Sequence, residues 1–228
     1  MNEGKHKNLA QSVYEQIKSE LFDFHLLPGD RFTEADVAAR TGASRTPVRE
    51  ALYRLQGDGY LEVHFRNGWQ VRPLDFEQLD ESYDLRIVLE QTAVKRLVSL
   101  DPAPLHDLLE PLESVWMGKP NLVKVEPFEV ADWDEAFHCS LVSGAGNREL
   151  ARVHAEATEK VRMIRRLDFT KKARVEATFE EHAAILRAIR KRRGDEAARL
   201  LGAHITVSRI EVRNITLHKL QSARPALP

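Results

Sequence analysis

Four side chains in the second half of the chain have the chemistry of metal ligands. After Val130, Asp134 and His138 are one helical turn apart and share a face with apolar residues. His182 and His204 lie in two later segments, each among apolar residues that would also face inward. A buried carboxylate is costly unless paired, and neutral imidazoles still need partners. A divalent ion would satisfy both demands, so these residues predict a metal centre.

The donor set suits zinc first, with nickel or manganese as alternatives. A salt-bridge network between Asp134 and the histidines, without an ion, is the competing interpretation. Cys139 is turned ~100° from His138 on a helix, which excludes it as a ligand. A metallohydrolase would need a general base as well as a zinc-bound water, and no inward glutamate has HExxH spacing. A purely structural ion is a third hypothesis.

Charged residues also fall on inward faces elsewhere. Between Leu79 and Leu97 the apolar face includes Arg86 and Glu90, which are spaced to form an internal ion pair. Arg162 and Arg165 could reach the same cavity from a later helix, and the pattern does not choose between them. The other histidines show no partner pattern and are expected at the surface: His25, His106, His154 and His218.

A second chemical signal lies near the N-terminus. From Arg40 to Arg54 there are four arginines and a single acid, Glu50. Arg45 and Arg49 are four residues apart, beside an apolar stripe that would face a core. An arginine near the start of such a helix can bond two acceptors of one guanine in the major groove. This arrangement predicts a DNA-reading helix.

The elements around these arginines have the order of a helix-turn-helix. Asn8 and Gln11 resemble a capping box that starts a first helix, and Pro28-Gly29 should stop that helix. Thr33 should cap a second helix, residues 34–40, and Gly42 a tight turn. Ser44 should cap the third helix, with Pro47 tolerated in its first turn.

A β-hairpin is expected after the third helix. Alternating runs at 60–65 and 69–72 are joined through Asn67-Gly68, a strong hairpin signal. This hairpin would form a wing, with His64, Arg66 and Gly68 near its tip and close to DNA.

Helical periods dominate after Leu74. Their breaks predict about six helices in an all-α bundle, with Asn147 and Asp195 as N-caps. We expect a mostly α fold: a winged helix-turn-helix of three helices and a hairpin at 1–74, a helical domain at 75–222, and a flexible tail at 223–228.

Composition limits the class of protein. The 228 residues are 43% hydrophobic and 30% charged, with a net charge of −1, as in ordinary globular proteins. A single cysteine excludes an intrachain disulfide and suits a reducing compartment. No apolar run approaches the roughly 20 residues of a membrane span, and the start has no signal peptide pattern. The expected location is the cytoplasm.

The stretch from Ser44 to Leu52, SRTPVREAL, with Leu55 and Gly59 after it, resembles the signature of the GntR family of bacterial regulators. The likeness covers residues 9–74. It implies a homodimer that binds a pseudo-palindromic operator, with Arg45 and Arg49 reading bases and Ser44 and Thr46 contacting phosphates. Some relatives read a base through an arginine where this chain has Ala35, so the operator sequence stays open.

The second half resembles the FCD ligand-binding domain of the FadR branch, in its six-helix VanR-like, metal-binding form. The likeness runs over about residues 79–217 and rests on the DEAFH run at 134–138, Gly146-Asn147, Glu181-His182, Gly194-Asp195 and His204. It implies that Asp134 and the three histidines hold an ion and that Arg86 anchors a small organic acid, with Arg162 as a further candidate from the helix pattern. The expected function is a ligand-responsive transcriptional regulator, a repressor of a metabolic operon, and not an enzyme.

Overall fold

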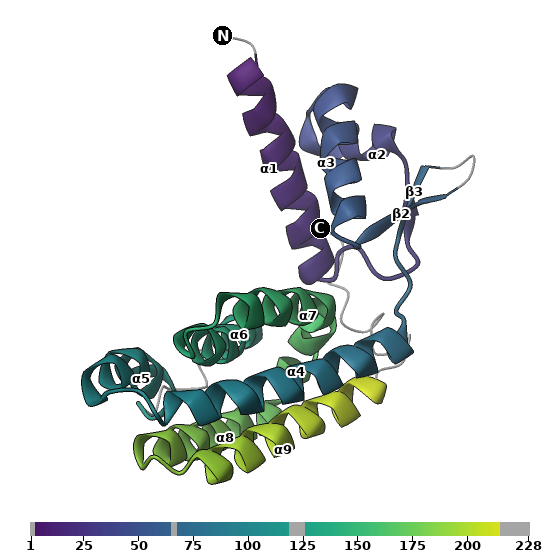
Figure 1. Ribbon diagram of the computed structural model, residues 1–228. Coiled ribbons are helices and arrows are strands. Elements are labelled where there is room, and N and C mark those ends of the chain that lie inside the picture. Colours follow the sequence, from purple (N-terminus) through teal and green to yellow (C-terminus); the bar gives the residue numbers. More distant parts are fainter. Residues whose placement is uncertain (1–2, 65–67, 119–125, 215–228) are drawn as a thin grey trace. The chain divides into compact units, whose positions relative to one another are not determined.

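The computed structural model describes residues 3–64, 68–118 and 126–214, and it divides between Asp75 and Phe76 into two compact units (Figure 1). The described residues are mostly helical, with one small sheet, as the sequence predicted. Each unit has its own core.

The N-terminal unit has three helices and a three-stranded sheet. The helices are α1 (Glu3–Phe22), α2 (Glu34–Thr41) and α3 (Arg45–Gly57). The strands β1 (Arg31–Phe32), β2 (Leu61–His64) and β3 (Gly68–Val71) pair antiparallel in the order β1-β3-β2. Helices α1 and α3 pack together over a core that includes Ile17, Leu21, Val48, Leu52 and Leu55. The predicted winged helix-turn-helix is confirmed.

The ends of these helices follow the sequence in part. Thr33 and Asp36 form a capping box at the start of α2, and Gly42 follows that helix with a φ of 66°. Ser44 is the N-cap residue of α3, but its side chain makes no capping hydrogen bond. The start expected at Asn8 is wrong: α1 begins at Glu3, because residues 3–7 include good helix formers and no proline. The stop expected at Pro28-Gly29 is wrong as well, because α1 already ends at Phe22, and Phe24 has a positive φ of 60°.

Strand β1 was not predicted, because two residues are too few to show a pattern of alternating polar and apolar side chains. It pairs Phe32 with Trp69 of β3. Gly68 has a φ of +92°, and a Cβ there would lie 2.6 Å from the carbonyl oxygen of Phe32. Glycine at 68 therefore lets β1 approach the hairpin. Residues 65–67 at the hairpin tip, Arg66 included, lie outside the described residues.

The C-terminal unit has six α-helices within its described ranges, 76–118 and 126–214. They are α4 (Phe76–Leu97), α5 (Pro102–Trp116), α6 (Pro127–Gly144), α7 (Arg148–Arg166), α8 (Lys172–Arg190) and α9 (Gly194–Arg213), with a 3-10 turn, η1 (Asp168–Thr170), after α7. Helix α4 contacts α6, α7 and α9, so it forms the centre of the bundle (Figure 1). The all-α bundle is as predicted.

Two expected caps have different outcomes. The Asn147 side chain caps α7 by accepting a hydrogen bond from the backbone N–H of Leu150 at 3.0 Å. The cap expected at Asp195 is wrong, because α9 begins at Gly194 and Asp195 lies in its first turn, where its charge complements the helix dipole. Among the described helices, none is both long enough and apolar enough to cross a membrane. The tail expected at 223–228 lies outside the described residues.

Candidate metal centre and nucleic-acid interface

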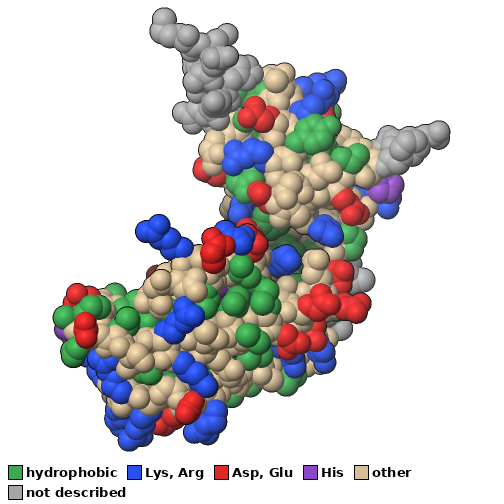
Figure 2. Space-filling view, viewed as in Figure 1, with side chains coloured by type: hydrophobic (Ala, Val, Ile, Leu, Met, Phe, Trp, Pro, Cys, Tyr) green, Lys and Arg blue, Asp and Glu red, His purple; other side chains and the backbone are tan. Residues whose placement is uncertain are grey.

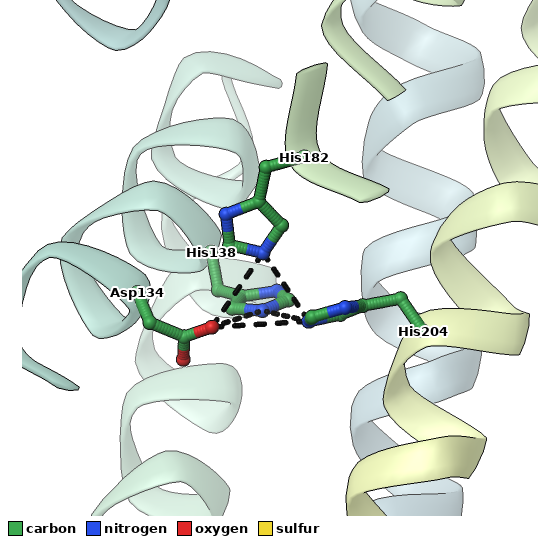
Figure 3. A group of neighbouring side chains, drawn as sticks. All are labelled: Asp134, His138, His182 and His204. Atoms are coloured by element: carbon green, nitrogen blue, oxygen red, sulfur yellow. Dashed lines mark hydrogen bonds and ion pairs between the residues drawn. The ribbon is translucent and has the colours of Figure 1, made fainter. Parts of the chain in front are cut away.

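The four residues expected to bind a metal converge in the core of the C-terminal unit (Figure 3). Asp134 and His138 come from adjacent turns of α6, His182 from α8 and His204 from α9. All four are buried, and one ligand atom from each lies within 4.8 Å of the others. Three helices thus bring residues 70 positions apart in sequence to one point.

The spacing of these atoms suits a tetrahedral ion. His204 Nε2 lies 3.2 Å from Nε2 of both His138 and His182. Asp134 Oδ1 lies 3.5–3.8 Å from the three Nε2 atoms. Bonds of about 2.0–2.1 Å place the corners of a tetrahedron about 3.3–3.4 Å apart. The five separations given above are close to this edge length, and all four atoms lie within 4.8 Å of one another.

The rings of His138 and His204 form hydrogen bonds through Nδ1, the nitrogen that faces away from the centre. Their Nε2 atoms therefore present lone pairs to the centre. Nδ1 of His138 donates to Glu90, and Nδ1 of His204 donates to Glu181 at 2.6 Å. Burial lowers the pKa of His204, as well as that of His182, well below the ordinary value, so both imidazoles are neutral. An imidazole that is protonated on Nδ1 presents a lone pair on Nε2.

At least three acceptors therefore face one another at the centre: Asp134 Oδ1 and Nε2 of His138 and His204. Asp134 Oδ1 has no hydrogen-bond partner among the described residues, and its contacts to the histidines are too long to replace one. A salt-bridge network without an ion would leave this carboxylate oxygen unsatisfied. Three imidazole nitrogens and one carboxylate oxygen are a donor set for zinc, nickel or manganese.

Arg165 of α7 holds the other oxygen of Asp134. Its Nη2 lies 2.5 Å from Asp134 Oδ2, and both side chains are buried. Burial by itself would raise the pKa of Asp134, but the Arg165 guanidinium and the nearby histidines hold it well below its usual range. Asp134 is therefore a carboxylate, with one oxygen for Arg165 and one for an ion.

Arg86 and Glu90 of α4 form the internal pair that the sequence allowed. Arg86 Nε lies 3.0 Å from Glu90 Oε1 in the core. Glu90 Oε1 also contacts His154 Nε2 at 2.9 Å. Arg86 Nη1 is buried without a hydrogen-bond partner in the described part of the chain. The pair thus leaves one arginine donor available.

The sequence did not predict the positions of two residues in this network, His154 and Glu181. His154 was expected at the surface, but it is buried on the inward face of α7, one turn from Thr158. The helical spacing of His154, Ala157, Val161 and Arg165 carried that signal. Glu181 was seen as part of a motif, and its bond to His204 depends on packing between α8 and α9 that no single helix reveals.

A small cavity adjoins the centre. Its lining includes Arg86, Asp134, Thr158, Arg162 and Arg165. Both arginines between which the sequence did not choose therefore reach it. Its free volume is about 20 Å³, room for about one water molecule. Arg162 Nε donates to Glu135 at 2.7 Å. Both side chains line the cavity and are partly exposed, so this ion pair lies at the solvent side of the cavity.

The expected DNA-reading side chains lie on the exposed face of α3. The core-facing stripe of α3 is fully buried, whereas Arg45, Thr46 and Arg49 line a hollow on the surface together with Tyr53. Ser44 is exposed at the start of the helix, and His64 is half-buried at the end of β2. On the face shown in Figure 2, charges of both signs are interspersed over this unit. Binding would therefore depend on a few placed side chains more than on a basic field.

Two family profiles match the chain. Residues 9–71 match the profile described as bacterial regulatory proteins, gntR family, and residues 81–207 match the FCD domain. The HTH-type transcriptional regulator YdhC of Bacillus subtilis is 32% identical over 192 residues, which are 84% of this chain and 85% of that protein. The Nta operon transcriptional regulator of Aminobacter aminovorans is 34% identical over 187 residues, 80% and 84% of the two chains.

A solved structure has the same architecture. Escherichia coli McbR/YncC aligns with a TM-score of 0.69 over 90% of this chain and 97% of that chain, at 23% identity. This likeness supports the fold.

Proposed function

The chain belongs to the GntR family of bacterial regulatory proteins and carries an FCD domain, and from this premise we propose that it is a metal-dependent repressor released from its operator by a small carboxylate. Membership makes it a DNA-binding transcriptional regulator and not an enzyme. In this proposal residues 1–74 bind DNA and residues 75–222 sense the effector.

The observation that carries the proposal is the buried cluster of one aspartate and three histidines, with its unsatisfied carboxylate oxygen, beside an arginine-lined cavity. Asp134, His138, His182 and His204 would hold a divalent ion, zinc first. Such an ion can accept one further oxygen ligand from water or from an effector. Within this chain, Arg165 keeps Asp134 charged and Glu90 and Glu181 orient two of the histidines.

The arginine at position 86 favours a carboxylate as the effector. Arg86 has a buried, unpaired Nη1 donor beside the cavity, and a guanidinium binds a carboxylate through two parallel bonds. The free volume of about 20 Å³ is too small for an organic acid. Entry would therefore require Arg162 to leave both Glu135 and Glu159, after which Arg86 and Arg162 could bind the acid.

DNA reading is assigned to α3 and the wing. Arg45 and Arg49 are placed to reach base edges, and Ser44 and Thr46 to bind phosphates. His64 and Arg66 of the hairpin would contact the DNA backbone. Gly68 has a structural role, because its lack of a side chain lets β1 approach at Phe32.

A homodimer is supported by an apolar stripe on the C-terminal unit. Four of its exposed large apolar side chains lie on the neighbouring helices α4 and α9: Leu85, Val88, Val207 and Ile210. Exposed acids, Glu77 and Glu81, lie at the start of α4, and an exposed base, Arg96, lies near its end. A second copy related by a two-fold axis perpendicular to α4 would place these acids opposite Arg96 of its partner, which makes the stripe self-complementary.

Regulation would be a population shift. Two half-sites must match the spacing of two recognition helices, so an effector that prefers one arrangement of the dimer changes operator affinity. The test is a titration of operator-bound, zinc-loaded dimer with a panel of mono-, di- and tricarboxylates, followed by fluorescence anisotropy. Release by one acid, lost in Arg86→Gln and in the metal-free protein, is expected. If no acid changes binding and the zinc-free protein behaves identically, the sensor proposal fails.

A further inference from the structure

Two of the three histidines at the centre are held by a carboxylate on the ring nitrogen that faces away from it. Glu90 accepts from Nδ1 of His138, and Glu181 accepts from Nδ1 of His204. The third ring, His182, has no hydrogen-bond partner for Nδ1 in the described residues and instead stacks on Phe137. Carboxylates in this position fix the tautomer and orientation of a metal-binding imidazole.

The two carboxylates differ in their surroundings. Glu181 is about one-third exposed, and its other partner is Arg174 of the same helix. Glu90 is completely buried, and its two oxygens have separate partners. Oε2 binds His138, whereas Oε1 binds both His154 and Arg86. Arg86 lines the cavity beside the centre, and neither Glu181 nor Arg174 does.

We propose that Glu90 is a positioning residue that couples Arg86 to the metal ligand His138. The inference rests on the proposed function for the ion and for the acid that occupies the cavity. An anion bound by Arg86 displaces the guanidinium from Oε1. Because a carboxylate is a rigid plane, a shift of Oε1 also moves Oε2 and the His138 ring that it holds. Glu181 orients His204 in the same way, but without a connection to the cavity.

This coupling would make the two ligands of the domain interdependent. Whatever factor an anion at Arg86 applies to the affinity for the ion, the ion must apply to the affinity for the anion. Glu90 is the one residue of the described chain that contacts both Arg86 and a member of the metal centre through different oxygens. His154 steadies the same carboxylate from α7.

The first measurement is Zn²⁺ affinity of the full-length protein, by competition with a chromophoric chelator. Glu90→Gln and Glu181→Gln are each expected to weaken Zn²⁺ binding by about 10- to 100-fold. Glu180→Gln, an exposed neighbour on α8, is the matched control and should leave the affinity unchanged. Wild-type affinity in Glu90→Gln would overturn the inference.

The second measurement isolates the coupling with Zn²⁺ alone. Arg86→Gln should change the Zn²⁺ affinity by about threefold or more in the wild-type background. It should have no effect in Glu90→Gln and its full effect in Glu181→Gln. An equal fold-change in both backgrounds, or none in the wild type, would show that Arg86 does not act through Glu90.

A third measurement needs no substitution in the core, in case Arg86→Gln does not fold. In zinc-loaded wild-type protein labelled with ¹⁵N-histidine, NMR should find a proton on Nδ1 of His138 and His204 and ligation through Nε2. Ligation of His138 through Nδ1 contradicts the proposed role of Glu90.

These outcomes separate the inference from the function. If the wild-type chain binds no divalent ion, both fail. If it binds Zn²⁺ and loses it in His182→Ala, but Glu90→Gln binds as the wild type does, the metal centre stands and only the coupling fails.

Discussion

Arg49 of α3 and Glu34 of α2 form an ion pair with two hydrogen bonds, both 2.9 Å long. The pair fixes the direction of an arginine that stays 58% exposed. The Arg49 hydrogen bonds lower the pKa of Glu34, so this residue is charged at neutral pH. To reach a base edge, Arg49 must exchange the Glu34 carboxylate for base acceptors. The negatively charged Glu34 would then lie near the DNA phosphates, which repel it.

Removing the Arg49 side chain should weaken DNA binding at one base position. For Arg49→Ala we expect a loss of about 1–3 kcal/mol that disappears when the contacted base pair is already changed. Fluorescence anisotropy on an operator series with each base pair replaced in turn measures this. Arg54→Ala, which removes the same charge from a guanidinium lying against Tyr14, is the control. An equal loss on every duplex would mean that Arg49 contacts phosphate.

Neutralising Glu34 should tighten binding to duplexes of any sequence. Glu34→Gln removes an acid beside the phosphates and frees Arg49, and exposed charges contribute about 0.2–1 kcal/mol. The gain, roughly 1.4- to fivefold at low salt, should disappear at high salt because the charges are screened. Glu15→Gln on α1 serves as the control. Weaker binding by Glu34→Gln would show that the pair orients Arg49 for DNA.

Removing the ion should destabilise the C-terminal unit. At an ion concentration 1,000 times its dissociation constant, binding contributes about 4 kcal/mol to the free energy of unfolding. A chelator should therefore lower the thermal midpoint of the wild type and have no effect on His182→Ala or Asp134→Asn. His106→Ala changes an exposed histidine of α5 and should respond as the wild type does. A chelator effect that survives His182→Ala would place the ion elsewhere.

Asp168 should make stability fall as the pH rises toward neutrality. Burial raises its pKa from 3.8 to about 6, against the opposing effects of Arg165, Arg174 and Lys171. Between these two values the folded state binds more protons than the unfolded state, so the free energy of unfolding decreases with rising pH. The total is on the order of 2–3 kcal/mol and is fully lost above about pH 6.

The measurement is chemical denaturation of the wild type and Asp168→Asn from pH 4 to 8. The difference between the two curves isolates this carboxyl group from Glu90 and Asp134, whose low pKa values act in the opposite direction. Asp168→Asn should be the more stable protein at pH 7 and lose that advantage at pH 4. Parallel curves would mean that Asp168 keeps an ordinary pKa.

Placing a charge on the apolar stripe should break the proposed homodimer. Val88 is 62% exposed on α4, and an aspartate facing a second copy at the same position would be desolvated beside a like charge. Val88→Asp should sediment as a monomer and lose most of its operator affinity. Met117→Asp, another exposed apolar position, should remain a dimer. A dimeric Val88→Asp would exclude this stripe as the interface.

Local signals predicted most of the fold. Thr33 with Asp36, Gly42 and Asn147 act within one or two helical turns, and the structure has each of them at a helix end. Strand β1 has two residues, so its formation depends on β3, thirty-seven positions away. Such a contact leaves no periodic trace in the sequence.

The four candidate ligands could be found from the sequence because each lies on the apolar stripe of its own helix. The groups that hold them were harder to find, since a hydrogen bond between two helices depends on their rotation and separation. Glu90 could bond Arg86 within α4 or His138 of α6, and it does both. Whether Arg162 or Arg165 faces the cavity was open for the same reason, and both line it.

The Arg162–Glu135 ion pair at the solvent side of the cavity has a consequence for the rate of acid binding. If that pair must open before an acid can enter, the observed binding rate will rise with acid concentration only until opening becomes the slow step. Above that concentration, the rate at which the ion pair opens, and not the acid concentration, sets the delay before gene expression changes. Different acids would then share one maximal speed, however different their affinities.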